Sequence, residues 1–281
     1  MNPDVLGATP SLRCGRFRLD LSRPRVMGVV NLTPDSFSDG GRFERLGDAV
    51  RHAEILIEEG ADLIDVGAES TRPGAAPVSA DDEVARLRPF LAALRDCPVP
   101  LSVDTRKPAV MRQVLDAGAS MINDVAGFVT KDARDAVAGS DCALCVMHMR
   151  GEPEGMQDDP RYDDVVRDVA TFLDTQANRL IDAGVAAGRL AIDPGFGFGK
   201  TFEHNRSLLA RLDAIVALGF PVLVGLSRKR MIGEITGRPV AHRMAGSLAA
   251  ALVAVERGAR IVRVHDVAAT VDAIRVWTAT R

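Results

Sequence analysis

The sequence predicts an α/β protein built as a (β/α)8 TIM barrel with a short N-terminal extension. Two observations carry this prediction. Short apolar segments alternate eight times with longer amphipathic ones from residue 26 onward, and a polar residue stands at or just past the end of each apolar segment. In a barrel those ends meet at one mouth, whereas in an open doubly wound sheet, the main alternative, they lie spread along an edge. The 281 residues fit one barrel of roughly 250 residues, and by length alone also two ordinary domains.

The apolar segments are continuous rather than alternating, which is the pattern of parallel strands buried on both faces. Predicted strands cover residues 26–31, 63–66, 101–104, 121–124, 143–148, 190–193, 222–226 and 261–264. Apolar residues three and four positions apart predict helices between them, including 47–59, 81–95, 163–183 and 204–218. We expect residues 1–25 to form the extension, with a hairpin at 16–21 plugging the bottom of the barrel, and residues 26–281 to form the barrel.

Composition excludes several classes of protein. The net charge of -3 and the aromatic content of 4% do not suit a nucleic-acid binder, which needs a basic face and stacking platforms. Charged residues or prolines interrupt every apolar stretch before the ~18 residues of a membrane span, and residues 1–25 show no apolar core of a secretion signal. We therefore expect a cytoplasmic protein that binds neither nucleic acid nor membrane.

Cys142 and Cys145 have the spacing of a C-x-x-C motif, but Cys142 directly precedes the predicted strand 143–148 and Cys145 lies in it. Residues three apart on a strand point to opposite faces, so these two sulfurs cannot share a ligand. We interpret them as reduced core thiols, which suits the cytoplasm.

Two polar loops follow the first two predicted strands. Residues 31–41 hold carboxylates, hydroxyls and a Gly-Gly pair, a set that suits a hard cation or a phosphate and a mobile lid, although turns favour the same residues. Residues 69–74 place hydroxyls beside an arginine, which indicates an anionic ligand or a solvated salt bridge.

A glycine-rich loop spans residues 193–201. The Walker pattern fails because its first glycine falls on Pro194, and the dinucleotide fingerprint fails because its third glycine falls on Lys200. The loop therefore predicts a ligand that approaches the backbone closely, and it argues against ATP.

Basic residues follow the last two predicted strands, in the runs 227–230 and 263–266. Loops at these places in barrels frequently hold phosphate. We expect Lys229 and Arg263 to face Asp104 and Asp193 across the mouth, because buried charges must be paired. Zinc-ligand spacing and a nucleophile-elbow motif are both missing from the sequence.

One motif accompanies each predicted strand, and the ordered set resembles the dihydropteroate synthases, barrel enzymes of folate biosynthesis. The motifs are MGVVNLTPDSFSDGG, LIDVGAESTRPGA, LSVDTRKP, INDVAG, VMHMRG, IDPGFGFGK, LVGLSRKRMIG and IVRVHDV, and the departures, Ala68 and Ala126, are minor. The resemblance runs from about residue 26 to the C-terminus. It implies that 6-hydroxymethyl-7,8-dihydropterin diphosphate condenses with 4-aminobenzoate, releasing diphosphate, with Mg²⁺ assisting. It also implies a homodimer formed through the last helices, and sulfonamides as competitors of 4-aminobenzoate.

The resemblance also implies the roles of individual residues. The pterin site is Asp104, Asn123, Met147, Asp193 and Lys229. The diphosphate site is Asn31, Thr71, Arg72, Arg263 and His265, with Asn31 also near the metal. The 4-aminobenzoate site is Phe37, Pro73, Phe198 and Ser227. The catalytic residues among these are Asp104, Asp193, Lys229, Arg263 and His265.

Other functions stay open at this point. A methyltetrahydrofolate:corrinoid methyltransferase would share the pterin residues but would not need the diphosphate residues or the loop at 31–41. A catalytically silent pterin-binding paralogue should have lost site residues, and none is missing. An isomerase with a barrel phosphate site is a more distant alternative.

Overall fold

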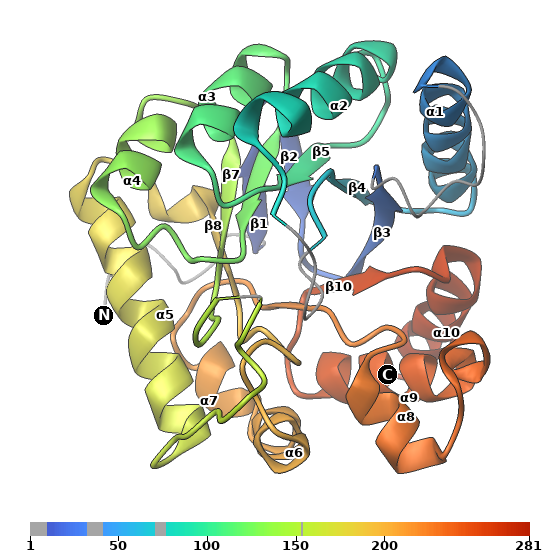
Figure 1. Cartoon of the computed structure of the whole chain (residues 1–281). Helices are drawn as coiled ribbons and strands as arrows, with labels where there is room; N and C mark the ends of the chain where they lie inside the picture. Colours follow the sequence, from blue (N-terminus) through green and yellow to red (C-terminus); the bar gives the residue numbers. More distant parts are fainter. Residues whose placement is uncertain (1–9, 33–41, 71–76, 153) are drawn as a thin grey trace.

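The computed structural model describes residues 10–32, 42–70, 77–152 and 154–281, with the backbone alone for residues 42–45. In this part of the chain, eight parallel strands form a sheet in the order β8-β7-β6-β5-β4-β3-β10-β9. A parallel bridge between Ile192 and Val222 joins the two outer strands and closes the sheet. Helices surround the strands (Figure 1). The predicted (β/α)8 barrel is therefore confirmed.

The strand bounds agree closely with the prediction. The strands are β3 (Arg25–Asn31), β4 (Leu63–Gly67), β5 (Leu101–Asp104), β6 (Met121–Asp124), β7 (Ala143–Met147), β8 (Leu190–Asp193), β9 (Leu223–Val224) and β10 (Ile261–Val264). Only β9 is much shorter than predicted, because the chain leaves the ladder at Gly225. A Cβ placed there would contact the side chains of Lys229 and Arg263, which occupy the space beside this glycine.

The helices follow the strands as a barrel requires. They are α1 (Arg42–Glu58), α2 (Ala80–Ala93), α3 (Pro108–Asp116), α4 (Lys131–Ala138), α5 (Val165–Asp182), α6 (Phe202–Ala210), α7 (Asp213–Val216), α8 (Arg230–Thr236), α9 (Met244–Glu256) and α10 (Val267–Ala279), with short 3-10 turns at Ala187–Arg189 and Val240–His242. Side-chain oxygens cap four of the N-termini, those of Ser79, Thr130, Asp164 and Thr201. The helix predicted at residues 204–218 is two helices, because Arg211 leaves the helical conformation with φ -117° and ψ 34°.

The apolar core has two parts. The larger part fills the layer between strands and helices. The smaller part lies inside the barrel and joins Leu12, Cys14, Leu19 and Leu21 to interior residues of the barrel strands. Leu12, Cys14 and Leu19 lie in an antiparallel hairpin of β1 (Ser11–Cys14) and β2 (Phe17–Asp20), and Leu21 directly follows it. The hairpin thus fills one end of the barrel interior, as expected, but it spans residues 11–20 rather than the predicted 16–21, because its first strand has only four residues and leaves little signal in the sequence.

The cysteines also match their interpretation. Cys145, in β7, belongs to the interior cluster, and Cys142, directly before β7, belongs to the outer one. The two thiols therefore lie on opposite sides of the barrel wall. All four cysteines are free. No helix in the described part of the chain is long and apolar enough to cross a bilayer.

Candidate active site at the barrel mouth

Three aspartates and an arginine form the floor of the mouth. Asp65, on β4, is fully buried, and its carboxylate accepts hydrogen bonds from Ser102 Oγ at 2.6 Å and from Arg263 Nε at 2.6 Å. The same guanidinium reaches Asp104 Oδ2 at 3.4 Å through Nη2. Asp193 closes the end of β8 and accepts a hydrogen bond from the backbone N–H of Gly195 at 2.7 Å. Arg263 therefore bridges two carboxylates from neighbouring strands.

Burial changes the protonation of these carboxylates. It raises the pKa of Asp104 to about 7, with the nearby charge of Asp65 adding to the shift and Arg263 opposing it. Burial also raises the pKa of Asp193, with Lys229 as the strongest opposing influence. In the free protein, Asp104 therefore titrates near neutral pH, and such a perturbed pKa is typical of residues in functional sites.

Lys229 follows β9, which lies between the strands of Asp193 and Arg263 in the closed barrel, and it occupies the N-cap position of α8. Its Nζ donates to the backbone carbonyl of Phe196 and lies 4.7 Å from the centroid of the Phe198 ring. Burial lowers the pKa of Lys229 to about 8, while Asp193 opposes that shift. The expectation that Lys229 and Arg263 face Asp104 and Asp193 agrees with this geometry.

Asn123 supplies an unsatisfied acceptor. It lies on β6 and is buried, with Nδ2 at 3.5 Å from Asp65 Oδ2. Its Oδ1 is buried without a hydrogen-bond partner among the described residues. A buried acceptor of this kind is costly unless a ligand donor meets it. Met147, at the end of β7, is buried in the same layer of strand ends.

The last strand brings an imidazole and a hydroxyl together. His265 follows β10, and its Nδ1 lies 3.0 Å from the Oγ of Ser227, which also accepts from the His265 backbone N–H at 3.3 Å. Ser227 is buried and already engaged in this pair. Asn31 lies at the C-terminal end of β3, the strand that pairs in parallel with β10. Phe37, Thr71, Arg72 and Pro73 lie outside the described residues.

The charge network contains residues that the sequence prediction left out of the site. Asp65 lies in the predicted strand 63–66, but its role in holding Arg263 was not predicted. Ser102, buried on β5, was missed because nothing in a single strand shows which face meets a carboxylate.

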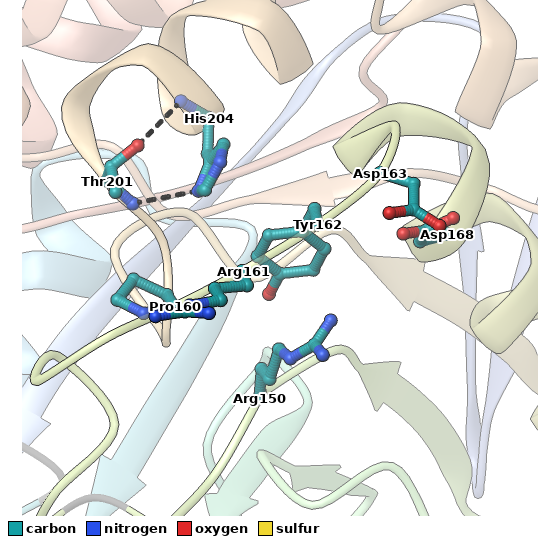
Figure 2. Close-up of a pocket in the computed structure, with 8 residues that line it drawn as sticks. All are labelled: Arg150, Pro160, Arg161, Tyr162, Asp163, Asp168, Thr201 and His204. Carbon is teal, nitrogen blue, oxygen red and sulfur yellow. Dashed lines mark hydrogen bonds between the residues drawn. The ribbon is translucent and has the colours of Figure 1, made fainter.

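A second hollow lies beside the mouth, between the loops that follow β7 and β8. It measures about 580 Å³ and is lined by Arg150, Pro160, Arg161, Tyr162, Asp163, Asp168, Thr201 and His204 (Figure 2). Thr201 and His204 cap each other across the start of α6. None of the predicted site residues lines this hollow.

A closed barrel with carboxylates, an amide and paired cations at the C-terminal strand ends is typical of a barrel enzyme with a polar, charged active site. The family described as pterin binding enzyme matches residues 27–265, and the chain belongs to that family. Within it, the similarity is to the dihydropteroate synthases. The chain is 50% identical over 272 residues to dihydropteroate synthase of Neisseria meningitidis serogroup C, covering 95% of this chain and 96% of that protein.

Solved structures agree. Xanthomonas albilineans dihydropteroate synthase with 4-aminobenzoic acid has a TM-score of 0.92 and 52% identity, covering 97% of this chain and 98% of that one. Burkholderia cenocepacia dihydropteroate synthase complexed with 7,8-dihydropteroate has a TM-score of 0.88 and 53% identity, covering 96% of each chain. The sequence resemblance is therefore confirmed over nearly the whole chain.

Proposed function

We propose that this chain is a dihydropteroate synthase that condenses 6-hydroxymethyl-7,8-dihydropterin diphosphate with 4-aminobenzoate and releases diphosphate. The observation that carries the proposal is the mouth itself. Asp104, Asn123 and Asp193 end β5, β6 and β8, Lys229 follows β9, and the amide oxygen of Asn123 has no partner among the described residues. A pterin presents a 2-amino group and ring N–H donors beside a 4-oxo acceptor, and this set of residues complements it.

The carboxylates have two tasks in this reaction. They orient the pterin, because each hydrogen bond to a charged partner contributes about 1.5–3 kcal/mol. They also stabilise the transition state: when the bond between the pterin methylene and the diphosphate oxygen breaks, positive charge spreads into the ring. Asp104 and Asp193 stabilise that charge as it develops.

The leaving group and the nucleophile need different help. Arg263 and His265, together with Thr71 and Arg72, would hold the diphosphate, since guanidinium pairs strongly with phosphate oxygens. The aromatic amine of 4-aminobenzoate is neutral at pH 7. It attacks the methylene carbon as the bond to the diphosphate oxygen breaks, and its proton passes to water or to the released diphosphate. The amine does not need a strong base, so the reaction requires no proton abstraction by the Ser227–His265 pair.

Mg²⁺ fits this site as a companion of the diphosphate. The described residues contain no group of three His, Cys, Asp or Glu side chains able to hold a metal alone. Mg²⁺ at phosphate sites takes few protein ligands and several phosphate and water oxygens, so the amide oxygen of Asn31 is a suitable donor. When bound, the ion would neutralise part of the diphosphate charge.

The 4-aminobenzoate pocket would be shaped by Phe37, Pro73, Phe198 and Ser227. Support comes from Phe198, whose ring lies against the Lys229 amine and so borders the pterin residues directly. Ser227 would act through its bond to His265, which links this pocket to the diphosphate side.

We further propose a cytoplasmic homodimer, organised as an extension over residues 1–25 and a barrel over residues 26–281. The small residues of α9 pack inside the chain, since a Cβ on Gly246 would meet Ile232 of α8 at 2.6 Å. Support for a dimer comes instead from exposed apolar side chains on the C-terminal helices and the turn between them, Ile235, Val240, Met244, Val253 and Val276. Light scattering at micromolar concentration tests this, and a monomeric mass would contradict it.

The experiment for the activity is turnover by the purified chain with Mg²⁺ and both substrates. We expect dihydropteroate as product and competition between sulfonamides and 4-aminobenzoate. Diphosphate release without incorporation of 4-aminobenzoate would indicate a different transferase. Methyl transfer to a corrinoid would favour the methyltransferase, and pterin binding without turnover would favour the silent paralogue.

A further inference from the structure

Lys200 is a buried lysine that the proposed mechanism does not use. Its Nζ lies 2.9 Å from His148 Nδ1 and from the Gly195 carbonyl oxygen, 3.0 Å from the Phe198 carbonyl oxygen and 3.2 Å from the His148 carbonyl oxygen. Among the described residues, no carboxylate lies within ion-pair distance of this amine. Three of the four neighbours are carbonyl oxygens, which only accept, so the N–H groups of Lys200 satisfy them.

This arrangement ties two loops together. His148 directly follows β7, whereas Gly195 and Phe198 belong to the glycine-rich loop after β8. The two backbones touch: Gly195 has φ +67°, and a Cβ there would collide with the His148 carbonyl oxygen. Gly199, with φ +60°, approaches the carbonyl of Arg150 in the same way. The glycines let the loops meet, and the Lys200 amine occupies the polar space that this contact leaves.

The other side of the same loop faces the mouth. The Phe196 carbonyl accepts from Lys229 Nζ, and the Phe198 ring lies beneath that amine. Phe198 thus offers its carbonyl to Lys200 and its ring to Lys229. A shift of the loop away from Lys200 would therefore move both groups that hold Lys229.

We propose that Lys200 is a positioning residue of the reaction, which fixes the loop at residues 195–199 so that it orients Lys229 and forms the 4-aminobenzoate side of the pocket. This inference rests on the proposed function. The alternative is that Lys200 only adds stability to a loop already held from outside. Tyr162 donates its hydroxyl to the Gly199 carbonyl at 2.8 Å, and Asn205 Oδ1 accepts from the Gly197 N–H at 2.7 Å.

The charge of Lys200 distinguishes a positioning role from a purely stabilising one. The groups that face Asp193 are Lys229, Lys200 and Arg263 together with the Gly195 N–H, and each of them lowers the pKa of this carboxyl against the effect of burial. His148 is neutral at pH 7, because burial, aided by Lys200, lowers its pKa to about 2. Burial lowers the pKa of Lys200 itself, and Asp193 opposes that shift. On the acidic side of the pH profile, where the amine is protonated, its loss should raise the pKa of Asp193 and move the acidic limb of kcat/KM to higher pH.

The test compares Lys200→Met with Tyr162→Phe, which removes one hydrogen bond from the same loop without changing any charge. For Lys200→Met we expect the KM for 4-aminobenzoate to rise on the order of tenfold, as small misplacements of substrate-positioning groups do, with a smaller change in kcat. The acidic limb should move to higher pH. In Lys200→Ala, n-propylammonium replaces the missing atoms and should restore the KM saturably, whereas tetramethylammonium should not. Tyr162→Phe should leave KM and the pH profile unchanged.

An unchanged KM and pH profile in folded Lys200→Met would overturn the inference, as would equal effects of the two substitutions. If Lys200→Met does not fold, His148→Ala takes its place. It removes one neighbour of the amine and should raise the KM in the same direction by a smaller factor, and an unchanged KM there also overturns the inference.

Failure of the proposed function gives a different result. The wild-type chain would then not make dihydropteroate, and hydrogen exchange decides the positioning role without turnover. The Phe198 N–H, bonded to the Gly195 carbonyl at 3.1 Å, should exchange faster in Lys200→Met than in wild type. Equal exchange in the two proteins would refute the positioning role.

Discussion

Asp65→Asn should weaken both the fold and the electrostatic arrangement of the mouth. Asparagine keeps the size of the side chain and one acceptor oxygen but removes the charge that faces Arg263 at 2.6 Å. Asp65 is fully buried, so water cannot replace the lost partner. The substitution therefore leaves a mostly buried guanidinium with Asp104, at 3.4 Å, as its remaining carboxylate.

The cost follows from this geometry. Breaking a buried ion pair by removing one partner costs about 3–5 kcal/mol. Because the Asn oxygen and Asp104 compensate in part, we expect a loss of about 2–3 kcal/mol in the free energy of unfolding. In the same variant the pKa of Asp104 should fall below about 7, because the charge of Asp65 is, after burial, the strongest influence that raises it.

Thermal unfolding and pterin binding measure the two effects. A loss of this size should lower the Tm by roughly 4–12 °C for a chain of this length. The matched control is Asp135→Asn on α4, whose ion pair with Lys131 at 2.6 Å is exposed and should contribute about 0.5 kcal/mol or less. A wild-type Tm in Asp65→Asn, together with an unshifted pH dependence of pterin binding, would refute the role given to Asp65.

Three further predictions concern the same strand ends. Asp193→Ala should abolish tight pterin binding while the fold is kept, and unchanged affinity in calorimetry of the folded variant would remove this carboxylate from the pterin site. Pterin affinity should rise with pH up to about 7 and then level off, because ligand N–H donors favour ionised Asp104, whose pKa in the free protein is about 7. Calorimetry in two buffers of different ionisation enthalpy should show proton release near pH 7, and proton uptake would contradict the assignment. Gly195→Ala should unfold the chain or lower its free energy of unfolding by more than about 2 kcal/mol. The φ of +67° at this position disfavours a side chain, and the Cβ would collide with the carbonyl oxygen of His148. A denaturation midpoint equal to that of wild type would contradict this prediction.

The strands and their functional ends could be predicted because burial on both faces leaves a clear signal. The strands at Leu101–Asp104 and Leu190–Asp193 have the bounds that the apolar runs predicted. In each strand an aspartate directly follows buried residues that cannot pair with its charge. A functional site at the strand end was therefore the interpretation that agreed with the cost of burying a charge. Closure into a barrel then followed from the number of such ends.

The contacts between strands could not be predicted in the same way. Asp65 and Arg263 are 198 positions apart, and nothing local to either residue shows that they meet. The glycine-rich loop illustrates the same limit. Its glycines were expected to admit a ligand to the backbone, yet Gly195 and Gly199 admit the carbonyls of the neighbouring loop. The position of Lys200 between these loops depends on that contact and has no signature in its own segment.

The most direct test of the proposed function is a crystal structure of the chain with 6-hydroxymethyl-7,8-dihydropterin diphosphate. The pterin should lie in the barrel mouth, with its ring N–H donors on Asp104 and Asp193, a donor on the free Oδ1 of Asn123, and its diphosphate toward Arg263. A pterin bound elsewhere, such as the hollow lined by Tyr162 and His204, with Asp104 and Asp193 untouched, would contradict the account.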